Sequence, residues 1–205
     1  MKKILSIVLA LVLVIGLAAC GSGSKKGSPE ATIDTLMEGI KTMDFEKIKG
    51  TMKDATDEDM DFTEDESIQA MYDIFKGWAS KLTYKLGKSE VNGDKATVAA
   101  DVTYTDAADL ISEAFTEYIS TAMTKAFSGE EVSEEEMQKL LMDTINEKAK
   151  SVGTKTAEAS LIFNLEKVGD DWKIVDPPED IANIMLSNMI NGLEGMFDGL
   201  IDIGD

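Results

Sequence analysis

Histidine and arginine are both absent from this chain of 205 residues, so lysine is its only basic side chain. Without histidine, the chain has no His-dependent catalytic triad, no imidazole general base and no histidine metal ligand. Without arginine, no planar guanidinium can hold a phosphate or a carboxylate through two parallel hydrogen bonds. These absences exclude many of the common hydrolase, metalloenzyme and phosphate-binding sites.

Cysteine and positive charge are scarce as well. Cys20 is the single cysteine, which excludes a disulfide within the chain. The 39 acidic residues outnumber the 20 lysines, and the formal net charge of −19 at pH 7 repels nucleic acid. An excess of acid of this size is typical of a solvated surface that keeps an exported protein soluble.

The first twenty residues have the order of an export signal. Lys2 and Lys3 precede an apolar run from Ile4 to Leu17, and small residues follow it. As a helix this run would rise only ~21 Å, which is well short of the roughly 30 Å hydrocarbon core of a bilayer. A permanent membrane span is therefore disfavoured.

The signal ends in Leu17-Ala18-Ala19-Cys20, which resembles the lipobox of bacterial lipoproteins. The resemblance implies a diacylglyceryl group on the Cys20 sulfur and cleavage just before that residue. Two acyl chains hold a protein firmly on a bilayer, so we expect a lipid anchor on the extracytoplasmic face of the cell membrane. Cleavage removes two lysines and no acid, which takes the net charge to −21. The alternative is an ordinary secreted protein with a free thiol.

Helices are expected directly after the anchor. Residues 20–28 are rich in glycine and serine, and we expect them to form a flexible tether. Ser28 fits the N-cap of a first helix, and Asp44 fits the N-cap of a short second one. Thr63 and Glu66 have the spacing of a capping box for a third helix.

The period of the apolar residues then changes from about 3.6 to 2, which indicates strands. Alternating residues on both sides of Asn92-Gly93-Asp94 predict a first β-hairpin. A second hairpin is predicted around Gly169-Asp170-Asp171, and it ends at Pro177 because proline donates no ladder hydrogen bond.

Two long helices are expected between the hairpins, in residues 106–152. Asp106 opens the first helix and Gly129 ends it, while Ser133 and Glu136 give the second helix a capping box. We expect the first helix to bury a long apolar face, made of Leu110, Ile111, Ala114, Phe115, Tyr118, Ile119, Ala122, Met123 and Phe127.

This order of elements predicts an α+β fold in which N-terminal helices pack on an antiparallel sheet. The domain spans residues 29–178, with the helical pair as an insertion. Residues 179–205 are expected to form one amphipathic, methionine-rich helix whose apolar stripe is Ile181, Met185, Met189, Leu193, Met196, Phe197 and Leu200.

Several short motifs resemble small lipoprotein domains of unknown function from Gram-positive bacteria, namely Ser28 to Ala31, Met43 to Ile48, Asn92 to Val98 and Gly169 to Val175. These domains are similar to the cystatin-like, nuclear transport factor two-like fold, so the resemblance implies a curved sheet wrapped around helices. It covers roughly residues 28–104 and 155–176, and the helical pair and the tail are additions to it. The same scaffold carries isomerases, binding modules and structural domains, so it implies no single function.

The acidic residues 57–66 are the candidate cation site. The aspartates at 57, 59 and 61 fit the first positions of a calcium loop. Phe62, however, stands where the loop needs glycine, and Ile68 stands where it needs a bidentate glutamate. We therefore expect a solvated acidic loop ahead of the third helix, and no metal or other cofactor.

Two aspartates are candidates for a catalytic base, Asp73 and Asp101. Alternation places Asp101 on the outward face of its strand, and no motif supplies either residue with a partner. We therefore expect no catalytic residue, and the chain is not expected to be an enzyme.

The aromatic residues are the candidates for a small apolar ligand pocket: Phe75, Trp78, Tyr84 and Tyr104, with Phe163 and Trp172 as further candidates. Plain core packing is the alternative. The methionines of the tail could form an adaptable surface for a partner or a second copy, or they could close the domain's own core.

The sequence thus favours a lipid-anchored, extracytoplasmic, non-enzymatic domain that binds a protein or a small apolar ligand at the cell envelope. The alternative from another class is a structural lipoprotein that self-associates through residues 179–205. A transporter's solute-binding subunit fits less well because two α/β lobes are not recognisable, and an isomerase-like enzyme fits less well because no acid or base is set in a motif.

Overall fold

The fold was obtained as a computed structural model, which describes residues 27–55, 66–129 and 132–201. The helices are α2 (Pro29–Thr42), α3 (Phe45–Thr51), α4 (Glu66–Ala79), α5 (Ala108–Ser128), α6 (Glu134–Ser151), α7 (Asp180–Met185) and α8 (Met189–Ile201). The strands are β1 (Thr83–Leu86), β2 (Glu90–Asn92), β3 (Lys95–Asp106), β4 (Lys155–Val168) and β5 (Asp171–Val175). The expected α+β class is confirmed.

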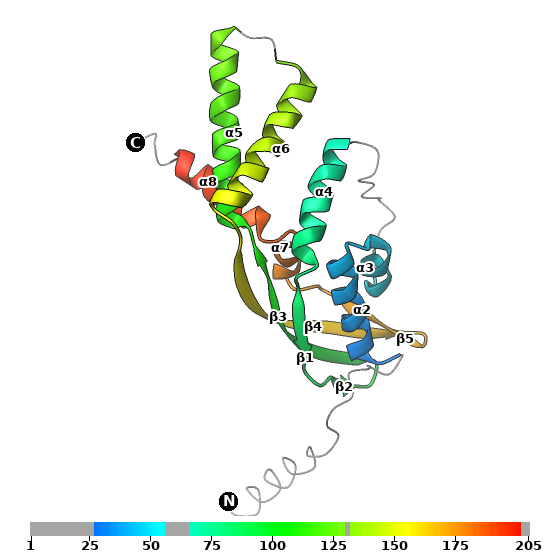
Figure 1. Cartoon of the computed structure of the whole chain (residues 1–205). Coiled ribbons are helices and arrows are strands. Elements are labelled where there is room, and N and C mark those ends of the chain that lie inside the picture. Colours follow the sequence, from blue (N-terminus) through cyan, green and yellow to red (C-terminus); the bar gives the residue numbers. More distant parts are fainter. Residues whose placement is uncertain (1–26, 56–65, 130–131, 202–205) are drawn as a thin grey trace, which may run out of the picture.

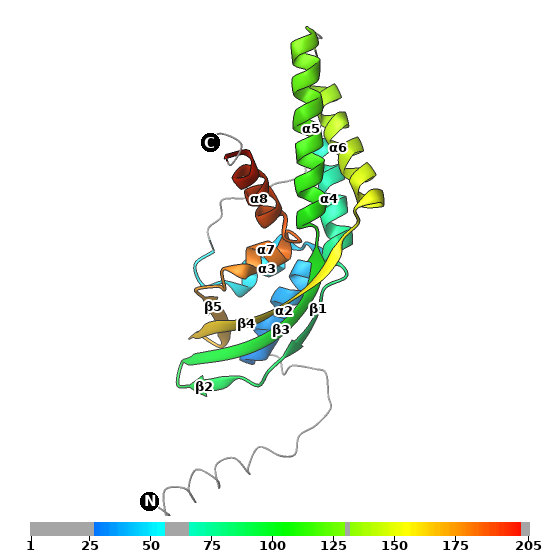
Figure 2. The same cartoon turned by 90° about the vertical axis from the view of Figure 1, so that its left-hand side faces the viewer.

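The strands form one antiparallel sheet in the order β1-β3-β4-β5, and β2 also pairs with β3. β3 and β4 are paired along the whole of β3, from Lys95 opposite Glu166 to Asp106 opposite Lys155. This long ribbon curves, and the helices α2, α3 and α7 lie within its curve (Figures 1 and 2). The expectation of helices packed on a curved antiparallel sheet is therefore confirmed.

A first hydrophobic cluster joins α2 to the inner face of the sheet. Four apolar residues of α2 recur at helical spacing and are at most 1% exposed, namely Ile33, Leu36, Met37 and Ile40. They pack against alternate residues of β3 and β4, including Val98 and Phe163, which are fully buried. Burial of each such side chain is worth roughly 1.5–3 kcal/mol, so this face holds α2 on the sheet.

A second cluster lies at the base of the helical hairpin formed by α5 and α6, which projects from one end of the sheet (Figure 1). It contains Leu110, Ile111 and Ala114 of α5 together with Ile145 of α6. The two helices are also tied by Lys148, whose Nζ lies 2.8 Å from a carboxylate oxygen of Glu117. Surface pairs of this kind are worth little, so the apolar base supplies most of the attachment.

The helix caps predicted at Ser28, Asp44, Gly129 and Ser133 are confirmed, whereas Thr63, the predicted cap of the third helix, lies outside the described residues. The Ser28 hydroxyl accepts a hydrogen bond from the backbone N–H of Ala31, and the Asp44 carboxylate accepts one from Lys47. Ser133 and Glu136 form the expected capping box. Gly129, with φ of 79°, ends α5 in the left-handed region that glycine tolerates best.

The two hairpin turns also lie where expected. Asn92 pairs with Lys95, and Val168 pairs with Asp171, so each turn has two central residues. The first hairpin is more complex than the sequence suggested, because β1 and β2 are separate segments that both pair with β3. Asp106 ends β3 rather than opening a helix, and its carboxylate accepts a hydrogen bond from the N–H of Ala108 at the start of α5.

The apolar face of α5 is shorter than expected. Met123 is 53% exposed and Phe127 is 83% exposed, so the prediction that both point inward is wrong. The cause is the length of the hairpin: its outer half extends beyond the sheet, where among the described residues only α6 lies beside α5 (Figures 1 and 2). Helical periodicity identifies the apolar face of a helix, but it does not show where along the helix the neighbouring elements end.

The C-terminal segment is two helices rather than the expected single one. Ser187 and Asn188 both have positive φ, 51° and 65°, which ends α7 and redirects the chain into α8. The carbonyl of Ser187 accepts a hydrogen bond from the N–H of Ala107, and the Asn188 amide donates one to Asp106. The break therefore ties the C-terminal helices to the junction of β3 and α5.

Candidate functional site

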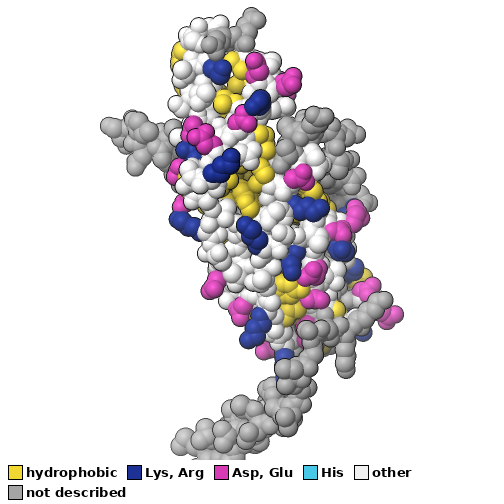
Figure 3. Space-filling view, in the orientation of Figure 1, with side chains coloured by type: hydrophobic (Ala, Val, Ile, Leu, Met, Phe, Trp, Pro, Cys, Tyr) yellow, Lys and Arg dark blue, Asp and Glu magenta, His cyan; other side chains and the backbone are white. Residues whose placement is uncertain are grey.

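The aromatic candidates Phe75 and Trp78 lie together in the second cluster. Their ring centroids are 5.4 Å apart and nearly perpendicular, and both side chains are at least nine-tenths buried. The void beside them, which Ile111 and Ile145 also line, has a volume of about 10 Å³. That is room for about one water molecule. Hydrophobic side chains gather on the surface at the base of the helical hairpin (Figure 3).

The other aromatic candidates belong to the first cluster. Tyr84 and Tyr104 are half-buried against it, while Phe163 and Trp172 are buried within it. The Tyr84 hydroxyl donates a hydrogen bond to the Asp34 carboxylate over 2.6 Å. Burial is the larger cause, and this hydrogen bond the next, of a pKa of Tyr84 that is raised above its ordinary value of 10.0. The structure thus divides the aromatic candidates between two clusters and does not gather them around one pocket.

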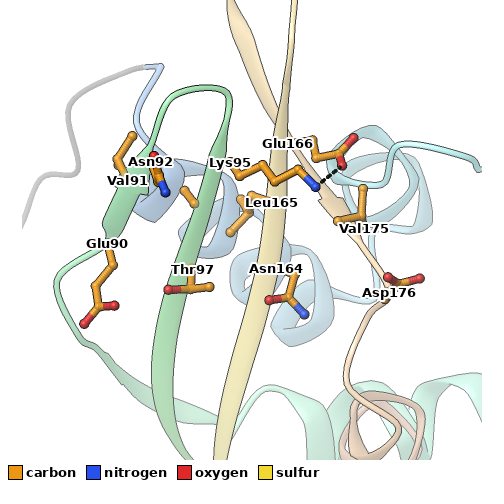
Figure 4. Close-up of a pocket in the computed structure, with 11 residues that line it drawn as sticks. Glu90, Val91, Asn92, Lys95, Thr97, Asn164, Leu165, Glu166, Val175 and Asp176 are labelled. Atoms are coloured by element: carbon orange, nitrogen blue, oxygen red, sulfur yellow. Dashed lines mark ion pairs between the residues drawn. The ribbon is translucent and has the colours of Figure 1, made fainter.

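A much larger hollow lies on the outer face of the sheet, across β2, β3, β4 and β5. It is an open groove of about 680 Å³ (Figure 4). Its floor is a row of directly paired residues, one from each strand: Glu90, Thr97, Asn164 and Val175. Asp176 follows at the end of β5, where its φ of 49° turns the chain away from the sheet. From β2 to β5 the groove therefore presents a carboxylate, a hydroxyl and an amide, and beyond Val175 a second carboxylate.

One wall of this groove is held by ion pairs. Glu166 pairs with Lys53, and Lys95 Nζ lies 3.6 Å from its other oxygen. The hydrogen bond from Lys53 holds the pKa of Glu166 below its ordinary value of 4.5, and the same contact raises the pKa of Lys53. The charges of this wall thus partly cancel one another. Glu90 and Asp176 have no ion pair among the described residues.

The groove could not be located from the sequence alone. Strand alternation does place Thr97 and Asn164 on outward faces. Their alignment with Glu90 and Val175 depends on the register of three strand pairs, which no local pattern specifies.

The candidate catalytic aspartates are on the surface and apart from the groove. Asp101 accepts a hydrogen bond from the Ser160 hydroxyl over 2.8 Å, and Asp73 accepts one from the Gln69 amide. Asp101 is exposed on the outer face of the sheet, as alternation predicted.

Other predicted site residues lie outside the described residues. These are Cys20 with the cleavage residues Leu17, Ala18 and Ala19, and residues 57–65 of the acidic stretch. In the part of the chain that the structure describes, no group of three or more Asp, Glu or Cys side chains is placed to hold a metal ion. No helix within residues 27–55, 66–129 and 132–201 has the length and apolarity needed to cross a membrane.

No protein-family model matches the chain, and no curated protein matches it. Among solved structures, the chain is similar to ycdA of Bacillus subtilis, described as a candidate lipoprotein, with 17% identity and a TM-score of 0.41. The match covers 89% of this chain and 54% of that protein, so the chain spans about half of its length. This likeness is too low to transfer a fold family or a function.

Proposed function

We propose that this chain is a lipid-anchored, extracytoplasmic, non-enzymatic domain that binds a protein at the cell envelope. The observation that carries the proposal is the shape of the hollow on the outer face of the sheet: an open groove of about 680 Å³ across four strands, lined by both hydrogen-bonding and apolar side chains. Small ligands are usually held in concave, mostly apolar sites that enclose most of their surface. A broad, open groove with a mixed lining suits a polypeptide better.

The apolar void supports the same choice. Beside Phe75 and Trp78 there is room for about one water molecule, so no small apolar ligand fits there without rearrangement of the second cluster. Of the two ligand classes that the sequence favoured, a protein partner is therefore the better supported.

The tether would hold the groove near the membrane. Six residues lie between Cys20 and Gly27, and even a fully extended chain spans at most about 25 Å between these two Cα atoms. The start of α2 lies at the groove's end of the sheet, because the Glu30 carboxylate accepts a hydrogen bond from the N–H of Ser89, just before β2. A lipid on Cys20 would thus present the groove to partners close to the membrane surface.

A photo-cross-linking amino acid at position 164, in the groove, tests the binding role. The matched control is the same substitution at Asn146, an exposed residue of α6. In the native host we expect a discrete protein adduct from position 164 and none from position 146. Equal labelling from both positions, or none from the groove, would contradict the proposal.

The anchor has its own test. Cells grown with a labelled fatty acid should incorporate the label into the full chain, and a Cys20→Ser variant should lose it. Label retained by that variant would contradict lipid attachment at Cys20. The non-enzymatic role would be refuted if the purified chain turned over any member of a panel of esters, glycosides and phosphate esters.

A further inference from the structure

The register of β4 shows which of its residues direct their backbone hydrogen bonds to β3 and which direct them to the opposite edge. The N–H of Lys167 donates to the carbonyl of Asp94, so these two residues form a hydrogen-bonded pair. In an antiparallel ladder such pairs alternate with non-bonded ones. The odd-numbered residues of β4 therefore bond to β3, and the even-numbered residues turn their N–H and C=O groups to the opposite edge.

On that edge, β5 covers only one end of β4. Its residues pair with Asn164, Glu166 and Val168. Toward the N-terminus of β4 the edge continues through four more even-numbered residues: Thr156, Glu158, Ser160 and Ile162. Within the described residues no strand pairs with these four on that side. Eight ladder groups over about 20 Å of strand are thus left without a backbone partner.

The outer edge of β5, unlike that of β4, has hydrogen-bond partners. The carbonyl of Trp172 accepts a hydrogen bond from the Thr32 hydroxyl, and the carbonyl of Ile174 accepts one from the N–H of Lys53. Proteins usually cover or shorten edge strands because unpaired ladder groups attract other strands. The edge of β4 from Thr156 to Ile162, in contrast, has no such cover among the described residues, and the side chain of Ile162 is 65% exposed.

We propose that the free edge of β4, from Thr156 to Ile162, accepts an extended segment of another protein as an added antiparallel strand. This inference rests on the proposed protein-binding function and adds a contact for the partner on the strand edge next to the groove, whose lining on β4 begins at Asn164. The segment carries an apolar residue opposite Ile162 and, four residues later, a basic residue opposite Glu158. Both then point to the outer face, since side chains alternate along a strand. The acidic character of the chain favours a neutral or basic partner.

A second copy of the chain fits this edge poorly. The two-fold register that would pair all four residues places the partner's residue 156 opposite Ile162. The residue at 154 of that copy would then lie opposite Asn164, a place that Val175 already occupies. Two chains of the same large negative charge also repel each other.

Hydrogen exchange on the full chain tests the premise. The amides of Ala157, Ala159 and Leu161 should exchange slowly, because they bond to β3. The amides of Thr156, Glu158, Ser160 and Ile162 should exchange fast. Equal protection of the two sets would show that the edge is already covered and would overturn the inference.

A synthetic strand tests the docking itself. The probe is a capped seven-residue peptide of β-branched residues with phenylalanine first and lysine fifth, titrated into the full chain in a neutral detergent. Methylation of its third and fifth backbone nitrogens, which would face β4, should weaken binding by roughly tenfold or more. Methylation of the fourth and sixth, which face away, should leave binding nearly unchanged. Equal effects of the two patterns, or no binding, would overturn the inference.

Matched variants of the protein complete the test. Ser160→Pro removes an N–H that faces the free edge and leaves the ladder to β3 intact, whereas Ser160→Ala removes only the side-chain bond to Asp101. We expect the probe to lose binding to the proline variant and to keep it with the alanine variant, with both variants folded by circular dichroism. If Asn164 cross-links to a partner in cells while both variants bind alike, the protein-binding function stands and strand addition is wrong. A dimer of the full chain that Ser160→Pro dissociates would show that a second copy is the occupant.

Discussion

Among the described glycines, Gly192 of α8 is the one where an added methyl group would meet the closest contacts. A Cβ built on it would lie 2.5 Å from the carbonyl oxygen of Ala108 and 2.9 Å from the Cα of that residue. Both atoms belong to the backbone of α5, so no side-chain rotation can relieve the contact. Gly192→Ala must push α8 away from the first turn of α5.

Two opposing effects set the magnitude. Alanine in place of glycine inside a helix is worth about 1 kcal/mol in helix propensity. Overpacking of a well-packed interface costs about 1–3 kcal/mol, and a backbone collision belongs at the upper end of that range. We therefore expect Gly192→Ala to lower the free energy of unfolding by about 2 kcal/mol, because the collision outweighs the propensity.

The control lies on the same helix. At Gly195 no heavy atom beyond its chain neighbours and the helix's own backbone lies within 4 Å of the place that a Cβ would take. Gly195→Ala should therefore raise the free energy of unfolding by up to about 1 kcal/mol. Urea unfolding of both variants beside the unchanged chain measures the two effects, which should have opposite signs. If Gly192→Ala proved as stable as Gly195→Ala, the close packing of α8 on α5 would be refuted.

Three further outcomes are expected. Ser133→Ala should lower the free energy of unfolding by about 1 kcal/mol, since it removes the cap of α6; an unchanged urea midpoint would contradict the capping box. Phe127→Ser should change it by less than about 0.5 kcal/mol, because the ring is 83% exposed; a large loss would place Phe127 in a core. The lowered pKa of Glu166 means that its pair with Lys53 stabilises the fold above the ordinary pKa of 4.5 and is lost as the pH falls through the folded-state value. The stability gap between the unchanged chain and Glu166→Gln should therefore close in acid, and a gap constant from pH 6 to 3 would refute this.

Most of the local structure was predictable because its causes are local. A hydroxyl or carboxylate within three residues of the N–H it accepts from, as at Ser28 and Asp44, needs no distant partner. The same holds for the glycine at the end of α5 and for the two-residue turns of both hairpins. The class of fold followed from the order of these elements.

Errors arose where the outcome depended on distant neighbours. The apolar spacing of Met123 and Phe127 matches that of Ile111, yet only the residues near the sheet find a partner to pack against. The break at Ser187 and Asn188 is not marked by proline or glycine, and it is tied to Ala107 and Asp106, some eighty residues away.

The candidate site shows the same division. Alternation along each strand determined which side chains face outward, such as Thr97 and Asn164, because successive residues of a strand point to opposite faces. The sequence also determined the composition that removes histidine and arginine chemistry, and it contains the lipobox-like segment on which the anchor is predicted. Only the tertiary structure decided that four strands align their residues in one groove and that β5 ends opposite Asn164, leaving the edge of β4 open. Register and edge coverage depend on contacts between segments that are distant in the chain, and no local pattern encodes them.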